Sequence, residues 1–198
     1  MRLFFAAHLP APVRAALVAA QEDLRARLGD AVRWTRPEAL HLTLKFLGEV
    51  DGARAPETLL AAAAEGLSPG GPLDLVVQGL GAFGGRRPRV VWAGVEGPDL
   101  EGLRRLAEHL DGALRPLGFP GDGRPYAPHI TLGRVRTPGR GLRHPAVTGD
   151  ALVSAVDATA LGPVPLRIEE LLLESSSFGS ARGPVRYRTE GRLPLDLA

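Results

Sequence analysis

Two segments of the chain open on the same four-residue pattern of a His, an apolar residue, a Thr and a Leu. They are HLTL at 41–44 and HITL at 129–132. Alternating polar and apolar residues are typical of a half-buried strand, in which residues two apart share a face. Each pattern therefore places an imidazole beside a hydroxyl, while the apolar residues between them turn into the core.

This pair of motifs suits in-line displacement at phosphorus. One group must take a proton from the nucleophile, and another must give a proton to the leaving oxygen on the opposite side. Histidine can do both near neutral pH. Thr43 and Thr131 can donate hydrogen bonds to the non-bridging phosphate oxygens as negative charge builds. The sequence thus predicts His41, Thr43, His129 and Thr131 as catalytic residues, with no metal ion and no cofactor required.

A single His-x-Thr is more often a strand histidine that is satisfied by a local hydrogen bond. Two copies in matching places of a repeated unit favour the catalytic interpretation instead. The other histidines, His8, His109 and His144, have no Thr partner and receive no role.

The elements that carry the motifs follow from apolar runs and helical periodicity. Strands are predicted at 2–9, 41–47, 73–80, 89–95, 129–135, 166–174 and 184–193, and helices at 12–28, 54–67, 99–116 and 150–156. The loop at 136–146 is rich in Gly and Pro.

The predicted order repeats along the chain. Strand, helix and strand over 2–47 match strand, helix and strand over 89–135, and the segment at 72–83 resembles the one at 165–178. We therefore expect a single domain over 1–198 with an internal duplication of units at roughly 2–83 and 89–178. The predicted fold is α+β. It has two pseudo-symmetric lobes, each an antiparallel-rich sheet with helices on its outer face, and an active-site cleft between them.

Composition narrows the functional classes. The 198 residues include 24 basic ones, of which only Lys45 is Lys, and the net charge is only +2. An Arg-rich but nearly neutral chain does not predict a nucleic-acid coat protein. There is no Cys, which excludes disulfides and a Cys nucleophile. Apolar runs are too short to span a membrane, and the N-terminus lacks the parts of a signal peptide. We expect a cytoplasmic protein.

The chain resembles the 2H phosphoesterase superfamily, and more narrowly the RNA 2′,3′-cyclic phosphodiesterases that are also called 2′-5′ RNA ligases. The resemblance covers nearly the whole chain. It is carried by RLFFAAHLP at 2–10, TRPEALHLTLKFLGEV at 35–50, RVVWAGVE at 89–96, RPYAPHITLGRV at 124–135 and LLLESSSF at 171–178.

The resemblance implies an enzyme that hydrolyses the 2′,3′-cyclic phosphate at an RNA end to a 2′-phosphate. In this interpretation His41 protonates the departing 3′ oxygen and His129 activates water, although the pseudosymmetry also allows the opposite assignment. With a 5′-hydroxyl RNA as nucleophile, the same site would give 2′-5′ ligation. Fragments of tRNA are candidate substrates, and a monomer suffices because the chain builds its own cleft. Two alternatives stay open: a phosphodiesterase for a small cyclic nucleotide or an ADP-ribose cyclic phosphate, and a non-catalytic RNA-end-binding protein.

Arg134 is predicted to bind substrate, because the second motif of the family carries an Arg there. Strict alternation would turn Arg134 away from His129, so this role requires a bulge or a strand end after Gly133. The alternative is an Arg in a surface salt bridge. Alternation also predicts that Lys45 shares the face of His41, from which it could reach an RNA phosphate. A solvated Lys at the strand end is the equal alternative. The aromatic side chains of Phe46 and Tyr126 are expected mainly to pack, with base stacking as the second possibility.

Overall fold

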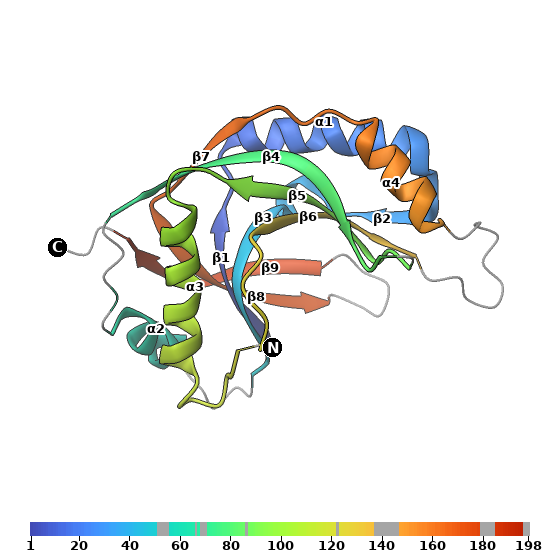
Figure 1. Ribbon diagram of the computed structural model, residues 1–198. Coiled ribbons are helices and arrows are strands. Elements are labelled where there is room, and N and C mark those ends of the chain that lie inside the picture. Colours follow the sequence, from blue (N-terminus) through green and yellow to red (C-terminus); the bar gives the residue numbers. More distant parts are fainter. Residues whose placement is uncertain are drawn as a thin grey trace.

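The computed structural model describes residues 1–50, 56–65, 67, 71–85, 87–121, 123–136, 147–178 and 185–195. Within them the chain forms one nine-stranded sheet with helices packed outside it (Figure 1). The strands are β1 (Arg2–His8), β2 (Val32–Trp34), β3 (His41–Glu49), β4 (Leu73–Phe83), β5 (Val90–Glu96), β6 (His129–Val135), β7 (Val164–Ile168), β8 (Glu170–Phe178) and β9 (Val185–Pro194). The α-helices are α1 (Ala11–Leu28), α2 (Pro56–Ala64), α3 (Leu100–Leu114) and α4 (Gly149–Asp157).

The strand order has a centre, the junction of β6 and β3, with four strands on each side. It runs β7-β4-β5-β6-β3-β1-β8-β9, with β2 attached to β6, and every described pairing is antiparallel. Strands β7, β4, β5 and β6 form one group, and β3, β1, β8 and β9 form the other. The two groups meet where Leu42 of β3 pairs with Ile130 of β6. The predicted α+β class with antiparallel strands is confirmed, and the two halves share one continuous sheet.

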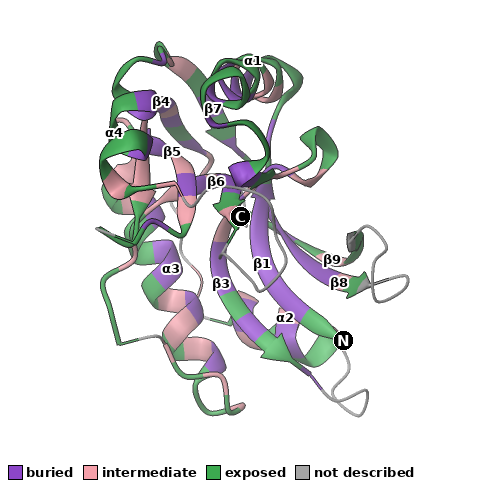
Figure 2. Cartoon of the chain, turned by 90° about the vertical axis from the view of Figure 1, so that its right-hand side faces the viewer, coloured by how far each residue is buried: buried purple, intermediate pink, exposed green. Residues whose placement is uncertain are grey.

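The helices cover the sheet in two pairs. Helices α1 and α4 lie together beside β4 and β7, whereas α2 and α3 lie together beside β3 and β9 (Figure 1). Helix α1 buries Val13, Leu17, Leu24 and Leu28, which recur at helical spacing and made the helix predictable. Buried residues concentrate along β1, β3 and β8 and on the inner sides of the helices (Figure 2).

One predicted strand is wrong. The apolar run at 166–174 is not a single strand, because the chain leaves β7 and enters β8 at Glu169. Strand β7 pairs with β4 at one edge of the sheet, while β8 lies between β1 and β9 in the other group. The short strand β2 was not predicted. It packs so closely on β6 that a Cβ at Gly133 would lie 2.6 Å from Val32 Cγ1.

Matching bulges interrupt β3 and β6. On β3, Phe5 pairs with Lys45 and Ala6 with Thr43, so Leu44 is the extra residue. On β6, Val91 pairs with Gly133 and Trp92 with Thr131, so Leu132 is the extra residue. A bulge reverses the in–out alternation of the residues beyond it. Lys45 and Gly133 are therefore buried, whereas Phe46 and Arg134 are exposed.

The bulge overturns the expectation that Lys45 shares the face of His41. Lys45 is 5% exposed, and its Nζ pairs with Oδ1 of Asp111 on α3 and donates to the carbonyl of Pro120 at 2.9 Å. The only lysine of the chain thus joins β3 to α3 and to the segment that follows α3. It is a structural cation and not a phosphate contact.

We predict that Asp111→Asn destabilises the fold by about 3 kcal/mol, because it leaves the buried Lys45 ammonium without a counter-charge. Urea unfolding followed by circular dichroism would measure the change. The control is Asp23→Asn on the exposed side of α1, which should stay within about 0.5 kcal/mol of the parent. Equal losses in the two variants would contradict a special role for the Lys45 pair.

Candidate active site

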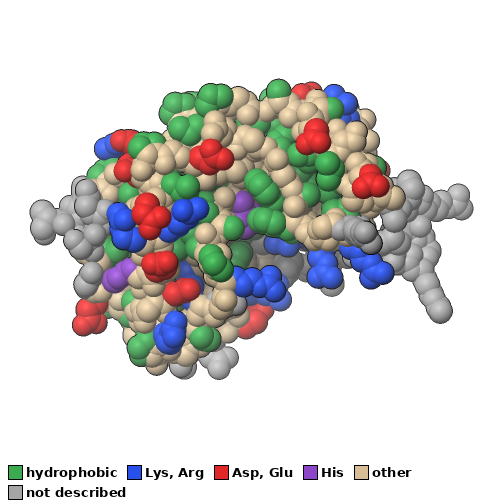
Figure 3. Space-filling view, in the orientation of Figure 1, with side chains coloured by type: hydrophobic (Ala, Val, Ile, Leu, Met, Phe, Trp, Pro, Cys, Tyr) green, Lys and Arg blue, Asp and Glu red, His purple; other side chains and the backbone are tan. Residues whose placement is uncertain are grey.

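The two His-x-Thr motifs lie side by side at the junction of β3 and β6. Leu42 and Ile130 pair across this junction and are fully buried. In an antiparallel pairing the adjoining positions also face each other, so His41 lies opposite Thr131 and Thr43 lies opposite His129. All four side chains share one face of the sheet, which we call the open face. The surface is hollowed between the two strand groups, and Arg side chains gather around this hollow (Figure 3).

The two imidazoles are held in the same way. Nδ1 of His41 lies 2.8 Å from the carbonyl oxygen of Ala39, and Nδ1 of His129 lies 2.8 Å from that of Ala127. A carbonyl oxygen can only accept, so each Nδ1 must carry the hydrogen. When the rings are neutral, Nε2 then bears the lone pair. Each histidine thus presents Nε2 for proton transfer, with its ring orientation set by the backbone two residues earlier.

Aromatic rings support both histidines. The His41 ring stacks on Phe4, with centroids 5.0 Å apart and planes 28° apart, and it meets Tyr187 edge-on at 5.5 Å. The His129 ring meets Phe83 edge-on at 4.9 Å. Phe83 in turn packs on Trp92 at 5.2 Å. These contacts restrict rotation of the imidazoles about χ2 and keep Nε2 on the open face.

Tyr126 ties one motif to the other. Its hydroxyl donates to the carbonyl oxygen of Thr43 at 2.8 Å, so the segment leading into His129 is fastened to β3. Burial raises the pKa of Tyr126 well above its ordinary value. The phenol therefore remains a protonated donor throughout the working pH range. This contact is a positioning one, in keeping with the packing role expected for Tyr126.

Arg134 reaches the open face because of the bulge at Leu132. Arg134 is exposed, although Ile130 and Leu132, which lie four and two positions before it in the same strand, are buried. Its positive charge is close enough to Tyr187 to act on the pKa of that phenol, although burial still raises this pKa overall. Arg134 thus lies on the same side of the sheet as His41 and its aromatic neighbours.

Gln21 holds the bulge itself. This residue of α1 is 3% exposed, and its Nε2 donates to the carbonyl of Leu132 at 2.7 Å and to that of Thr35 at 2.9 Å. Sequence reasoning missed Gln21. The available signal was an amide on the apolar stripe of α1, between Leu17 and Leu24.

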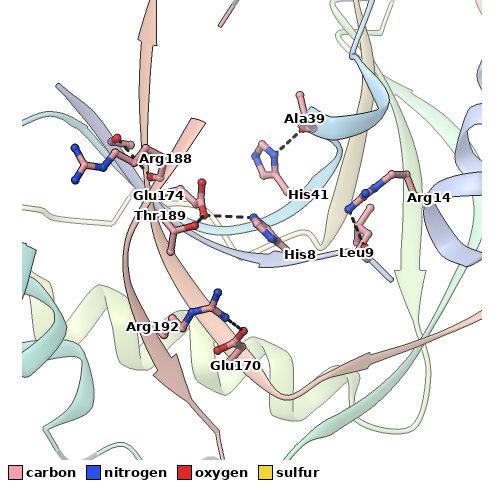
Figure 4. Close-up of polar contacts among 11 residues, drawn as sticks. His8, Leu9, Arg14, Ala39, His41, Glu170, Glu174, Arg188, Thr189 and Arg192 are labelled. Carbon is pink, nitrogen blue, oxygen red and sulfur yellow. Dashed lines mark hydrogen bonds and ion pairs between the residues drawn. The ribbon is translucent and has the colours of Figure 1, made fainter. Parts of the chain in front are cut away.

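A carboxylate beside His41 was also missed. Glu174 of β8 has a side chain that is 4% exposed, and its Oε1 lies 3.3 Å from His8 Nε2 and accepts from Thr189 Oγ1 at 2.6 Å (Figure 4). Burial raises the pKa of Glu174, but the contacts with His8 and Thr189 outweigh burial and lower it overall. Glu174 is therefore ionised at neutral pH. The signal was a single charged residue directly after the apolar run of three Leu at 171–173.

Burial also shifts His41. It lowers the pKa of the imidazole below the ordinary value, while the Ala39 carbonyl and the charge of Glu174 oppose the shift and His8 adds to it. In the free protein His41 is thus mainly neutral at pH 7. A bound anion would favour the imidazolium form.

Two of the histidines that received no role from sequence are not part of the site as described. His109 contacts the carbonyl of Ala63 through Nε2. His144 lies outside the described residues. The described residues contain no cluster of three or more His, Asp or Glu side chains arranged to hold a metal ion. None of the described helices is long and apolar enough to cross a bilayer.

We predict that the neutral forms of His41 and His129 carry their proton on Nδ1. Long-range ¹H–¹⁵N correlation spectra recorded above the pKa of each ring would show the tautomer. His109 is the internal control, because its carbonyl contact is made through Nε2 and requires the opposite tautomer. An Nε2–H form at His41 or His129 would contradict the arrangement described for the open face.

The chain is similar to known phosphoesterases over most of its length. The family model of LigT-like phosphoesterases matches residues 8–92 and again residues 96–184. An RNA 2′,3′-cyclic phosphodiesterase from Thermus thermophilus is 37% identical over 201 residues, covering 93% of this chain and 96% of that protein. One from Methanothermobacter thermautotrophicus is 33% identical over 175 residues, covering 86% and 91%.

Solved structures resemble the chain over nearly its whole length. TT0787 of Thermus thermophilus superposes with a TM-score of 0.75 at 32% identity, covering 98% of each chain. The LigT protein of E. coli in complex with 3′-AMP superposes with a TM-score of 0.71 at 31% identity, again covering 98% of each. Since the family model matches most of the chain in two successive segments, the chain belongs to the LigT-like phosphoesterases and is an enzyme of that family.

Proposed function

We propose that the protein hydrolyses 2′,3′-cyclic phosphates at RNA ends to 2′-phosphates. The relatives named RNA 2′,3′-cyclic phosphodiesterases support this reaction. The observation that carries it is the matched pair of imidazoles, each held through Nδ1 by a carbonyl two residues earlier and each presenting Nε2. Two equivalent proton-transfer groups on adjacent strands suit a reaction in which one group takes a proton from the nucleophile and the other gives a proton to the leaving oxygen.

In the proposed mechanism, Nε2 of His129 takes a proton from water as the water oxygen bonds to phosphorus. The bond between phosphorus and O3′ breaks, and Nε2 of His41 gives its proton to O3′. The phosphate stays on O2′, and the two histidines exchange protonation states before the next cycle. Thr43 and Thr131 donate hydrogen bonds to the non-bridging oxygens, whose negative charge grows in the transition state. No metal ion takes part in this scheme.

Arg134 is proposed to bind the phosphate or the terminal nucleoside. Its position on the open face, beyond the Leu132 bulge and near Tyr187, supports this role. A guanidinium suits a phosphate diester because it offers several N–H donors in one plane.

The finer features of the function are also proposals. Fragments of tRNA with cyclic phosphate ends are candidate substrates, and the 5′-hydroxyl of a second RNA in place of water would give a 2′-5′ linkage. We propose a cytoplasmic monomer, since one chain supplies both motifs. We also propose an internal duplication of units 2–83 and 89–178, which the symmetric strand order and the paired bulges support.

We predict turnover of an oligonucleotide that ends in a 2′,3′-cyclic phosphate, in the presence of EDTA, to a 2′-phosphate end. His41→Gln and His129→Gln should each lower kcat by about 10²–10⁴-fold, because each variant lacks one proton-transfer group. Mass spectrometry and ³¹P NMR would identify the product.

The matched control for these variants is His109→Gln, whose imidazole lies on α3 away from the open face and which should keep parental turnover. A metal requirement or a 3′-phosphate product would refute the mechanism. An RNA-end-binding protein without catalysis would bind the oligonucleotide in all variants and release no product.

Glu174→Gln tests the assignment of acid and base through pH. The Glu174 charge raises the pKa of His41, so its removal lowers the protonated fraction of His41. If His41 is the acid, the alkaline limb of the kcat/KM profile should move to lower pH in the variant, because a larger fraction of His41 has lost its proton there. If His41 is the base, the acidic limb should move to lower pH instead. The second pattern would reverse the assignment.

A further inference from the structure

A small polar pocket adjoins His41 on the side away from β6. It has a volume of about 190 Å³, and its lining includes His41, Phe4, Tyr187, His8, Glu174 and Arg14. Drug-sized ligands occupy pockets of about 300–1,000 Å³, so this one suits a single ring system. Phe4 is only 3% exposed and its ring stacks on His41, so Tyr187 is the accessible aromatic ring of the pocket. Figure 4 shows His8 pointing toward Glu174, with His41 beside it on the neighbouring strand.

The proposed mechanism uses His41 but leaves the rest of this pocket without a role. The pocket is unsuited to phosphate, because Glu174 is ionised and a second carboxylate, that of Glu38, also lines it. An ionised carboxylate only accepts hydrogen bonds, so the ligand must supply N–H or O–H donors. The ring of Tyr187, which is 38% exposed, favours a flat ligand that can stack on it.

Glu174 is prepared for such a donor. His8 and Thr189 both hold its Oε1, which fixes the carboxylate. Among the described residues, no hydrogen bond to its other oxygen, Oε2, is found. This oxygen is therefore the one that can accept a hydrogen bond from a ligand N–H.

Arg14 supplies hydrogen-bond donors, whereas Glu174 only accepts. Its Nη2 donates to the carbonyl of Leu9 at 3.1 Å, and its buried Nε has no hydrogen-bond partner among the described residues. A guanidinium has five N–H donors, so Arg14 retains donors for acceptor atoms of a ligand. The pocket therefore combines a fixed acceptor in Glu174, spare donors in Arg14 and an exposed aromatic ring in Tyr187.

Guanine matches this combination better than the other bases. Its N1–H and N2 amino group are two donors on one edge, while O6 and N7 are acceptors that Arg side chains commonly bind. Adenine presents an amino group in place of O6. Uracil flanks its single N–H with two carbonyl oxygens, which a carboxylate repels.

We propose that this pocket holds the base of the terminal nucleoside and that Glu174 and Arg14 make it select guanine. The inference rests on the proposed function, because O3′ accepts its proton from His41 and belongs to the same ribose that carries the terminal base. A 2′,3′-cyclic end has no nucleotide beyond it, so the base next to His41 is the terminal one.

The test compares kcat/KM for the 2′,3′-cyclic monophosphates of guanosine, adenosine, cytidine and uridine. We expect guanosine to exceed uridine roughly 10- to 100-fold, the range that a charge-assisted hydrogen bond gives. Glu174→Gln should shrink the ratio of guanosine to uridine. The pH effect of this variant on His41 cancels in that ratio, because it acts on all four substrates alike. The control is Glu170→Gln, the same change on the same strand at a residue paired with Arg192, which should keep the parental ratio.

Equal kcat/KM values for the four bases in the parent protein would overturn the proposal, whether or not the variant folds. So would a ratio that Glu174→Gln leaves unchanged. Calorimetric binding of guanosine 2′-phosphate and uridine 2′-phosphate separates this proposal from the proposed function. A guanosine preference in binding without turnover of any substrate would refute the phosphodiesterase activity and keep the pocket. Turnover of all four substrates without base preference would refute the proposed pocket and keep the phosphodiesterase activity.

Discussion

The pairing of β3 with β6 is the contact on which the site depends. It brings Leu42 opposite Ile130, and both side chains are fully buried. Burying an aliphatic side chain of this size contributes about 1.5–3 kcal/mol, which opposes any change of register. A slip by one residue would turn the leucines outward and the His and Thr side chains into the core. The same apolar residues that hold the two strand groups together therefore also hold the four polar side chains on one face.

The bulges determine what surrounds these four side chains. In β3 the bulge at Leu44 follows Thr43 and turns Phe46 to the open face. In β6 the bulge at Leu132 follows Thr131 and turns Arg134 to the same face. The two strands are anchored differently at this point. Lys45 ties β3 to α3 through Asp111, whereas Gln21 of α1 holds the carbonyl of Leu132 in β6. A symmetric backbone thus presents an aromatic ring in one half and a guanidinium in the other.

Much of this arrangement could be predicted from local patterns. The alternation of polar and apolar residues and the helical spacing of apolar residues identified most elements and the two motifs. Both patterns arise because one face of each element is buried. The bulges at Leu44 and Leu132 could not be found this way, since they depend on how a distant strand pairs. Lys45 was wrongly placed for that reason. The split of 166–174 into β7 and β8 has the same cause, because both strands are apolar and only their partners differ. Glu174 and His8 were missed because their contact joins opposite ends of the chain.

The two histidines share a backbone setting but not an environment. His41 is half-buried between Phe4 and Tyr187, next to His8 and the ionised Glu174. His129 meets the edge of Phe83 and pairs across the strands with Gly94. Burial lowers the pKa of His41, and the charge of Glu174 offsets part of that shift. The imidazolium of His41 therefore forms most readily when an anion binds beside it. In the proposed mechanism His41 is the acid, and an acid that acquires its proton together with the anionic substrate is charged only when it is needed. The different surroundings of the two histidines give this property to His41 alone.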